Sequence, residues 1–218
     1  VSDPGRYYSN NVVGSINLLE AMRSRDVKRL VFSSTCATYG VPTKVPIDEA
    51  HPQRPINPYG TSKWMVEQML RDYADAYAVR SIALRYFNAA GADPDGETGE
   101  DHFPETHLIP CALAATEGDA TPLTIHGDDY DTPDGTCIRD FVHVSDIAQA
   151  HVLALRRLDD GEAARAINLG SGHGYSVKEV LQCVERARNA ASLRSPTTTS
   201  ARRDARRAVL SEAAVGDR

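Results

Sequence analysis

The sequence predicts an α/β protein in which helices cover both faces of a parallel β-sheet. Short apolar segments alternate along the chain with longer segments of helical periodicity, and loops rich in Gly, Pro and Asp separate them. The chain has 218 residues, of which 41% are hydrophobic, so it is long enough to bury a sizeable core. An alternation of this kind is typical of parallel sheets whose strands are joined by helical crossovers.

The first half of the chain supplies two helices and two strands. Apolar residues recur at helical spacing in residues 7–25 and again in residues 58–78. They are Val12, Ile16, Leu19 and Met22 in the first segment, and Val66, Leu70, Tyr73 and Tyr77 in the second. The apolar segments 28–34 (KRLVFSS) and 81–87 (SIALRYF) each follow one of these helices, and their length and composition predict strands.

The second half of the chain repeats this pattern after a Gly- and Asp-rich loop over residues 88–106. Helices are expected at 108–117, 145–158 and 176–190, and strands at 123–127, 137–144 and 166–170. The sequence contains no internal repeat.

The composition argues against several classes of protein. The net charge of −6 gives no reason to expect a nucleic-acid partner, and no apolar run reaches the 18 residues of a membrane span. The four cysteines form no CxxC pattern and are typical of free thiols in a reducing cytosol, which predicts a cytoplasmic protein. They are Cys36, Cys111, Cys137 and Cys183. No metal site is expected, because His102 and His107 are separated by Pro104 and match no repeated carboxylate–histidine pattern.

The stretch PINPYGTSKW, residues 55–64, places Tyr59 four residues before Lys63. One interpretation is an ordinary helix start, with Pro58 in the first turn and Lys63 reaching into solvent. The other is a catalytic pair on one helix face, because four residues advance a helix by about 6 Å. A neighbouring ammonium lowers the pKa of a tyrosine from its ordinary value of about 10, which gives a base usable near neutral pH. The Tyr-x-x-x-Lys pattern often occurs by chance, so by itself it does not distinguish a catalytic pair from an ordinary helix start.

Two polar stretches interrupt the expected strands. FSSTCATYG, residues 32–40, lies at the end of the first strand, where open α/β sheets bind ligands. Its Thr35 precedes Tyr59 by 24 residues, and a strand-end hydroxyl followed by Tyr-x-x-x-Lys on the next helix resembles the layout of a short-chain dehydrogenase-type active site. In the strand at 137–144, Arg139 suits bidentate phosphate binding, and a buried pair with Asp140 is the structural alternative. The G-x-G-x-x-G turn by which such folds often bind a dinucleotide does not occur in the 218 residues.

Seven motifs in order over residues 7–185 resemble the extended short-chain dehydrogenase/reductases, in particular the NAD-dependent epimerase/dehydratase family. They are YYSNNVVGSINLLEAM, FSSTCATYG, PINPYGTSK, LRYFNAAGADPDG, HLIP, DGTCIRDFVHVSDIAQAH and NLGSGHGYSVKEV. The resemblance implies a Rossmann-like, doubly wound parallel sheet with a smaller substrate-binding part. It also implies NAD as cofactor and the interconversion of UDP-glucose and UDP-galactose by inversion at sugar carbon 4.

The resemblance also implies roles for individual residues. Tyr59 is expected to be the catalytic base and acid, Lys63 its partner, and Thr35 a hydrogen-bonding group for the sugar hydroxyl. The cofactor-binding residues implied are Asn10, Ser33, Tyr59, Lys63 and Phe87. The substrate-binding residues implied are Thr35, Asn88, Leu108, Thr124, Arg139 and Phe141, the last standing where the family more often has Tyr.

Three alternatives accompany this hypothesis. The first is an epimerase of another UDP-sugar, such as UDP-arabinose, UDP-xylose or a UDP-N-acetylhexosamine. The second, a 4,6-dehydratase, is disfavoured because Cys36 and Ala37 follow Thr35 where that family has an Asp-Glu pair. The third is a non-catalytic fragment, because the family's Gly-rich NAD-binding turn precedes its matching motifs.

We therefore expect residues 1–190 to form a partial catalytic domain without the Gly-rich NAD-binding unit, and residues 191–218 to form a basic tail. The tail carries a net charge of +3, against −9 for residues 1–190, and shows no apolar periodicity. The 218-residue chain by itself is expected to be inactive. In the intact enzyme, a homodimer through the helices at 7–25 and 58–78 is implied by the resemblance.

Overall fold

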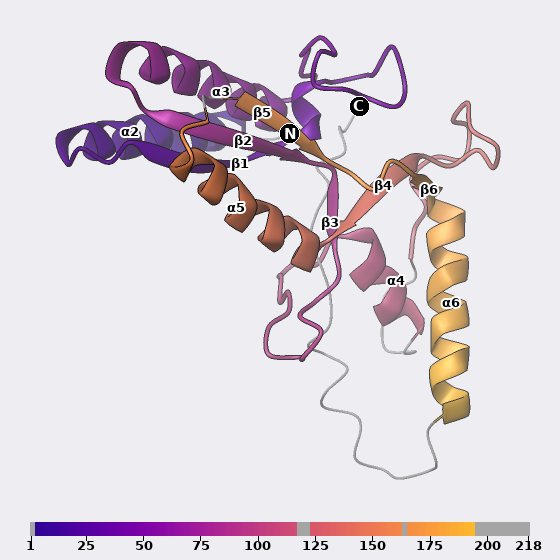
Figure 1. The fold of residues 1–218 in the computed structure, drawn as a ribbon. Coiled ribbons are helices and arrows are strands. Elements are labelled where there is room, and N and C mark those ends of the chain that lie inside the picture. Colours follow the sequence, from indigo (N-terminus) through magenta and orange to yellow (C-terminus); the bar gives the residue numbers. More distant parts are fainter. Residues whose placement is uncertain (1–2, 117–122, 163–164, 195–218) are drawn as a thin grey trace. The chain divides into compact units, whose positions relative to one another are not determined.

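The computed structural model describes residues 3–116, 123–162 and 165–194, and its elements are labelled in Figure 1. The chain divides into two compact units. The first unit contains the residues up to Phe87 together with Asp146–Gly170. The second contains Asn88–Ser145 and the segment that begins at Ser171. This division is interleaved along the chain, and the predicted boundary at residue 190 falls inside a helix that continues to Arg194.

The first unit is built on a parallel three-stranded sheet. Its strands are β1 (Arg29–Thr35), β2 (Arg80–Tyr86) and β5 (Arg165–Leu169), in the order β1-β2-β5. Both strand pairs are parallel, with Thr35 opposite Tyr86 at the carboxyl end of the sheet. The predicted parallel α/β architecture and the three predicted strands of this sheet are confirmed.

The helices of the first unit match the predicted segments, with one irregularity. The segment expected at 7–25 consists of α1 (Pro4–Tyr7), a π-helical stretch (Tyr8–Val13) and α2 (Gly14–Ser24). The other two helices are α3 (Pro58–Tyr77) and α5 (Val144–Asp159). The π-helical stretch carries the predicted cofactor residue Asn10, and π-helical turns are frequent at functional sites.

Helices pack against both faces of the parallel sheet. On one face, Leu19 and Met22 of α2 join Val66 and Leu70 of α3 over Leu30 and Phe32 of β1. On the other face, Ala154 and Leu158 of α5 pack against Ile82 and Leu84 of β2 and Val31 of β1. Successive residues of β1 thus point to opposite faces, as a strand buried on both sides requires.

The second unit contains a short mixed sheet and two helices. Its strands are β3 (Asn88–Ala90), β4 (Ile138–His143) and β6 (Gly174–Ser176). β3 is parallel to β4, and β6 is antiparallel to β4. The helices α4 (Leu108–Thr116) and α6 (Val177–Arg194) contact each other.

The sequence-based prediction of the second unit is wrong in two details. Residues 123–127, expected to form a strand, have no regular structure and are mostly exposed, because no described strand pairs with them. The short strands β3 and β6 were not expected, since three residues are too few to show a period. Of the predicted tail, residues 195–218 lie outside the described part of the chain. Among the described helices, none combines the length and the apolar character that crossing a membrane demands.

Candidate active site

Helix α3 begins beside the end of β1, and its first turn is fixed by local sequence. The side chain of Asn57 accepts a hydrogen bond from the Gly60 backbone N–H at 2.8 Å, which caps the helix, and Pro58 occupies the first helical position. A Cβ atom on Gly60 would lie 2.5 Å from the Ala37 carbonyl oxygen. Glycine therefore allows the start of α3 to approach the 3₁₀ turn Cys36–Thr38 that follows β1.

Tyr59 and Lys63 lie on the same side of α3, and Lys63 contacts β1 near its carboxyl end. The Lys63 Nζ atom donates a hydrogen bond to the Ser33 carbonyl oxygen at 3.0 Å. It lies 5.0 Å from the centre of the Phe32 ring and 5.8 Å from the centre of the Tyr59 ring. The Tyr59 ring also meets the Tyr7 ring edge-on, with 6.0 Å between their centres. The ammonium is thus held close to the phenol by the strand it contacts.

The hydroxyl groups at the end of β1 are held by different partners. Thr35, which is 7% exposed, accepts a hydrogen bond from the Ala37 backbone N–H through its side chain. The Ser33 hydroxyl lies 3.0 Å from Nε2 of His151 on α5. Nδ1 of the same ring lies 2.8 Å from the Ile147 carbonyl oxygen, so it carries a proton. In the neutral imidazole, Nε2 then accepts the Ser33 proton.

A cavity of about 170 Å³ opens beside Lys63. Its lining combines amide and ammonium groups with an apolar surface. The lining residues are Asn10, Asn11, Gly14, Ser15, Leu18, Phe32 and Lys63. The Asn11 amide donates to the Ser62 hydroxyl at 2.9 Å, which ties the π-helical stretch to α3. A Cβ atom on Gly14 would meet nothing within 4 Å, so the space beside this glycine is open.

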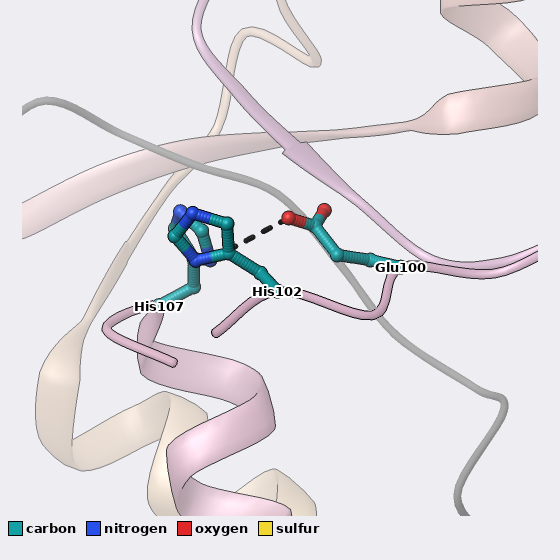
Figure 2. Close-up of side chains that lie close together, drawn as sticks. All are labelled: Glu100, His102 and His107. Carbon is teal, nitrogen blue, oxygen red and sulfur yellow. Dashed lines mark ion pairs between the residues drawn. The ribbon is translucent and has the colours of Figure 1, made fainter. Parts of the chain in front are cut away.

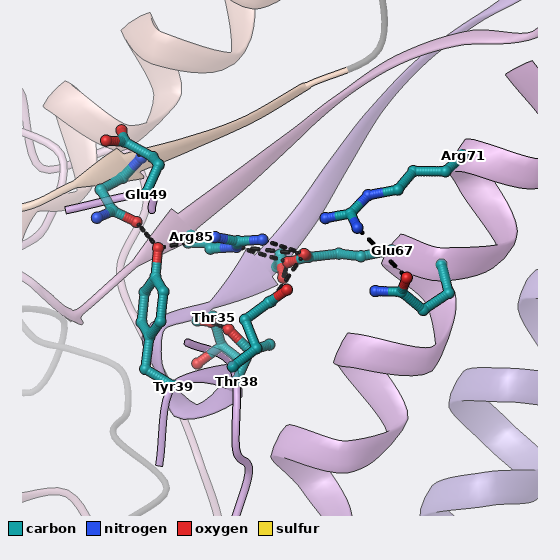
Figure 3. Close-up of polar contacts among 11 residues, drawn as sticks. Thr35, Thr38, Tyr39, Glu49, Glu67, Arg71 and Arg85 are labelled. Carbon is teal, nitrogen blue, oxygen red and sulfur yellow. Dashed lines mark hydrogen bonds and ion pairs between the residues drawn. The ribbon is translucent and has the colours of Figure 1, made fainter. Parts of the chain in front are cut away.

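A buried ion pair lies behind the site (Figure 3). Glu67 on α3 and Arg85 on β2 are each 2% exposed, and Arg85 Nη2 lies 2.5 Å from Glu67 Oε2. Arg85 Nε donates to both Glu67 oxygens, at 2.9 and 3.2 Å, and the Ser34 hydroxyl donates to Oε1 at 2.5 Å. The other end of the guanidinium donates to the Tyr39 hydroxyl at 2.8 Å. The pair therefore links α3, β2 and the residue of β1 that lies between Ser33 and Thr35.

Glu67 and Arg85 shift each other's pKa. Burial by itself raises the pKa of Glu67, but the hydrogen bonds from Arg85 and Ser34 and the positive charge of Arg85 outweigh it, so the pKa lies below its ordinary value. Burial lowers the pKa of Arg85, and the hydrogen bond and charge of Glu67 raise it to a net value above the ordinary one. Both groups are therefore ionised at neutral pH.

The predicted site residues divide between the two units. Asn10, Ser33, Thr35, Tyr59, Lys63 and Phe87 belong to the first unit, and Asn88, Leu108, Thr124, Arg139 and Phe141 to the second. Within the first unit, the cavity and the end of β1 bring Asn10, Ser33, Tyr59 and Lys63 into one neighbourhood. Phe87 directly follows β2, and its backbone N–H donates to the Leu169 carbonyl oxygen.

Within the second unit, strand pairing places Asn88 of β3 opposite Phe141 of β4. The Asn88 amide donates to the Asp140 carbonyl oxygen at 2.6 Å. Asp140 itself accepts hydrogen bonds from the turn at Ser171 and Gly172, whereas Arg139 donates to the Ile138 carbonyl oxygen. In the described part of the chain no ion pair joins Arg139 to Asp140. Leu108 begins α4, and Thr124 lies exposed in the irregular stretch.

Sequence reasoning missed the supporting residues Glu67, Arg85 and His151. A signal for the first two was present, because each is a charged residue inside an otherwise apolar helix face or strand, and such residues are rarely buried without a partner. His151 gives no comparable signal. It contacts Ser33 across 118 residues of sequence, and no local pattern indicates that contact.

The model of the family described as "NAD dependent epimerase/dehydratase family" matches residues 1–170. The chain belongs to this family. The match covers the strand ends, the start of α3 and the residues around Lys63, and it confirms the resemblance; it ends within the last of the seven motifs.

Similar proteins cover the same part of the chain. A UDP-glucose 4-epimerase of Rhizobium meliloti is 53% identical over 186 residues, which are 85% of this chain and 57% of that protein. A crystal structure of UDP-glucose 4-epimerase from Brucella ovis in complex with NAD has a TM-score of 0.83 and 55% identity, covering 85% of this chain and 57% of that one. A structure of the Bifidobacterium longum enzyme in complex with NAD⁺ and UDP has a TM-score of 0.78 and 41% identity, covering 87% and 57%. The chain thus spans a little over half the length of these relatives.

Proposed function

We propose that this chain supplies the catalytic tyrosine, its lysine partner and part of the UDP-sugar site of an NAD-dependent UDP-glucose 4-epimerase. The observation that carries the proposal is the position of Tyr59 and Lys63 on one side of α3, with Thr35 at the end of the adjacent strand. The 53% identity to the Rhizobium meliloti epimerase supports the choice of substrate. The reaction proposed is the interconversion of UDP-glucose and UDP-galactose.

The residues around the cavity fit one end of an NAD molecule. The cavity offers the Asn10 and Asn11 amides and the Lys63 ammonium beside the apolar Phe32 ring. Its volume of about 170 Å³ is below the ~300–1,000 Å³ of complete ligand pockets, so it suits part of the dinucleotide. When bound, NAD supplies the hydride acceptance and return that inversion of a secondary alcohol carbon needs.

The chain's own residues handle the proton and hold the sugar. Tyr59, as phenolate, takes the proton of the sugar 4-hydroxyl and later returns it. The positive charge of Lys63 favours the phenolate, and its hydrogen bond to Ser33 keeps the ammonium near the ring. The Thr35 hydroxyl hydrogen-bonds the same sugar hydroxyl. The surrounding contacts of α3 with β1 fix these groups before substrate binds.

The second unit is proposed to hold the UDP part of the substrate. Arg139 is suited to the diphosphate, because a guanidinium binds phosphate oxygens in a bidentate manner. Asn88 and Phe141 lie opposite each other on neighbouring strands, and together with Leu108 and Thr124 they complete the proposed set. This assignment is carried over from the family resemblance. The Bifidobacterium longum structure with UDP supports a UDP-containing ligand.

The proposed activity is tested in a chimaera of the Rhizobium meliloti epimerase. In this chimaera, the 186 aligned residues of that enzyme are replaced by their counterparts from this chain. We expect the chimaera to convert UDP-galactose to UDP-glucose in a coupled assay and to bind NAD in calorimetry. The 218-residue chain alone is expected to bind NAD more weakly than the micromolar range, because the G-x-G-x-x-G turn that holds a pyrophosphate is absent from it.

Three outcomes would contradict parts of this proposal. A folded chimaera that binds NAD but turns over only UDP-N-acetylglucosamine, UDP-arabinose or UDP-xylose would replace the substrate. Formation of a 4-keto-6-deoxy sugar would indicate a dehydratase. Micromolar NAD binding by the 218-residue chain would show that residues other than a Gly-rich turn hold the cofactor.

We further propose a homodimer through α2 and α3, in a cytoplasmic enzyme. Apolar side chains remain exposed on these helices and at the end of the π-helical stretch: Val13 and Leu18 are each 51% exposed, and Ile16 and Met65 are each 40% exposed. Trp64 is half-buried, and Met69 packs against the cluster beneath α3, so neither adds much to the exposed apolar surface. Exposed apolar patches of this kind commonly mark interfaces. The four cysteines are free thiols, in keeping with a reducing compartment.

The dimer is tested by changing one exposed residue on each helix. Sedimentation of the chimaera at micromolar concentration is expected to give a dimer, and Ile16→Glu together with Met65→Glu is expected to give a monomer. The matched control is Val152→Glu. Val152 is 51% exposed and belongs to α5, the helix on the other face of the sheet. A monomeric chimaera, or dimers that survive both changes, would contradict the proposed interface.

A further inference from the structure

Three potential metal ligands lie together in the second unit, between β3 and α4 (Figure 2). They are Glu100, His102 and His107, and one possible ligand atom from each lies within 4.8 Å of those of the other two. His107 Nδ1 lies 3.8 Å from Glu100 Oε1, and the centres of the two imidazole rings are 5.1 Å apart. The sequence did not suggest this cluster, because Pro104 separates the histidines. The structure nevertheless folds the loop so that both rings meet.

One of these nitrogens is buried without a hydrogen bond. The His107 side chain is 10% exposed, and among the described residues its Nδ1 atom has no hydrogen-bond partner. Glu105 Oε1 lies 2.6 Å from Nδ1, but this oxygen accepts hydrogen bonds from the backbone N–H groups of Thr106 and His107. A buried polar atom without a hydrogen bond destabilises the fold unless another group binds it. Nδ1 faces Glu100, so an ion bound between them would supply the partner that Nδ1 lacks.

We propose that Glu100, His102 and His107 bind a divalent cation of the zinc class. Zinc bonds to imidazole nitrogen and carboxylate oxygen are each roughly 2.0–2.2 Å long, so one ion can bridge the 3.8 Å between His107 and Glu100. His102 is exposed, and its candidate ligand atom already lies within 4.8 Å of those of the other two residues. Two histidines with one glutamate form a known set of zinc ligands, which leaves the fourth position open.

The surrounding charge favours a cation at this place. Glu105 lies beside the proposed ligands, and with Glu100 it supplies two carboxylates around the two histidine rings. The ion would join the loop that precedes α4 to the first residues of that helix, since the His107 carbonyl oxygen accepts the hydrogen bond from the Cys111 N–H.

The test titrates the untagged 218-residue chain, stripped with a chelator and dialysed, with zinc chloride in a calorimeter. We expect saturable binding of one zinc ion per chain. His102→Gln and Glu100→Gln should each weaken binding by at least about tenfold, because even residues outside the ligand set change affinity by about 10–100-fold. His102 decides the test, since its exposed side chain can be replaced without disturbing the fold, and circular dichroism checks each variant.

Two control variants separate this cluster from other zinc-binding groups. His126→Gln removes an exposed histidine of the same unit, and Cys183→Ser removes the exposed thiol. Both should bind zinc as the unchanged chain does. Zinc should also raise the thermal unfolding midpoint of the unchanged chain and leave that of His102→Gln almost unaffected. Absence of saturable binding, wild-type affinity in both ligand variants, or loss of binding in either control would overturn the proposal.

Discussion

A Tyr59→Phe variant of the chimaera is expected to lose about 10²–10⁴-fold in turnover while it keeps most of its affinity for UDP-sugar. The change removes one oxygen atom, the proposed acceptor of the proton from the sugar hydroxyl. It leaves the ring, its edge-on contact with Tyr7 and the capped start of α3 in place. The coupled assay measures turnover, and calorimetry with UDP measures binding.

Tyr73→Phe is the matched control, because it makes the same change on the same helix. The Tyr73 hydroxyl donates to Glu20 at 2.6 Å, on the side of α3 that packs on α2, and Tyr73 does not line the cavity. This variant is expected to keep near-complete turnover. If Tyr59→Phe kept near-complete turnover as well, Tyr59 would be an ordinary residue of a helix start and the proposed base would be wrong.

Lys63→Ala complements this test through its dependence on pH. Loss of the neighbouring positive charge disfavours the phenolate, so turnover should fall at neutral pH and its optimum should move upward. A merely structural lysine would lower turnover equally at every pH. An unchanged optimum in a folded Lys63→Ala variant would contradict the proposed electrostatic role.

A Glu67→Ala variant is expected to lower the free energy of unfolding by about 3–5 kcal/mol. It leaves the Arg85 guanidinium, which is 2% exposed, without its countercharge in the core. It also removes the acceptor of the Ser34 hydroxyl and of the Gln53 amide. Urea denaturation of the 218-residue chain measures the loss.

Glu20→Ala is the contrasting control, because Glu20 forms an ion pair with Arg23 on the surface, where both side chains are more than 40% exposed. Solvent screens an exposed ion pair of this kind, so the loss should be several-fold smaller than for Glu67→Ala. Replacing both Glu67 and Arg85 by Met should cost less than Glu67→Ala alone, since no charge is then left unpaired. Equal losses for Glu20→Ala and Glu67→Ala would contradict the buried-pair argument.

The same pair predicts how stability depends on pH. The pKa of Glu67 lies below its ordinary value of 4.5 in the folded chain, so the unfolded chain takes up the proton first. Its contribution is complete above about pH 4.5 and is lost as the pH falls through the lowered folded value. The slope of unfolding free energy against pH below 4.5 should therefore be smaller in Glu67→Gln than in the unchanged chain.

Much of the first unit was determined by sequence signals that act over short distances. Asn57 and Pro58 specify where α3 begins, because capping and proline geometry are local effects. The four-residue spacing of Tyr59 and Lys63 then places both on one face of that helix. The alternation of Leu30, Val31 and Phe32 in β1 follows from the two-residue period of a strand buried on both faces.

The partners of these residues across the fold were decided only by the tertiary structure. Glu67 meets Arg85, His151 meets Ser33, and Tyr39 donates to Asn168, which is 129 residues away. Each contact depends on the strand order β1-β2-β5 and on the helix that covers each face. The approach of His102 to His107 likewise depends on the path of an irregular loop. Such a loop has no helical or strand periodicity from which its path could be predicted. Local conformation follows from nearby residues, whereas these contacts form only after distant segments have packed together. Packing removes the polar groups from water, and each buried group then requires a hydrogen-bond partner within the fold.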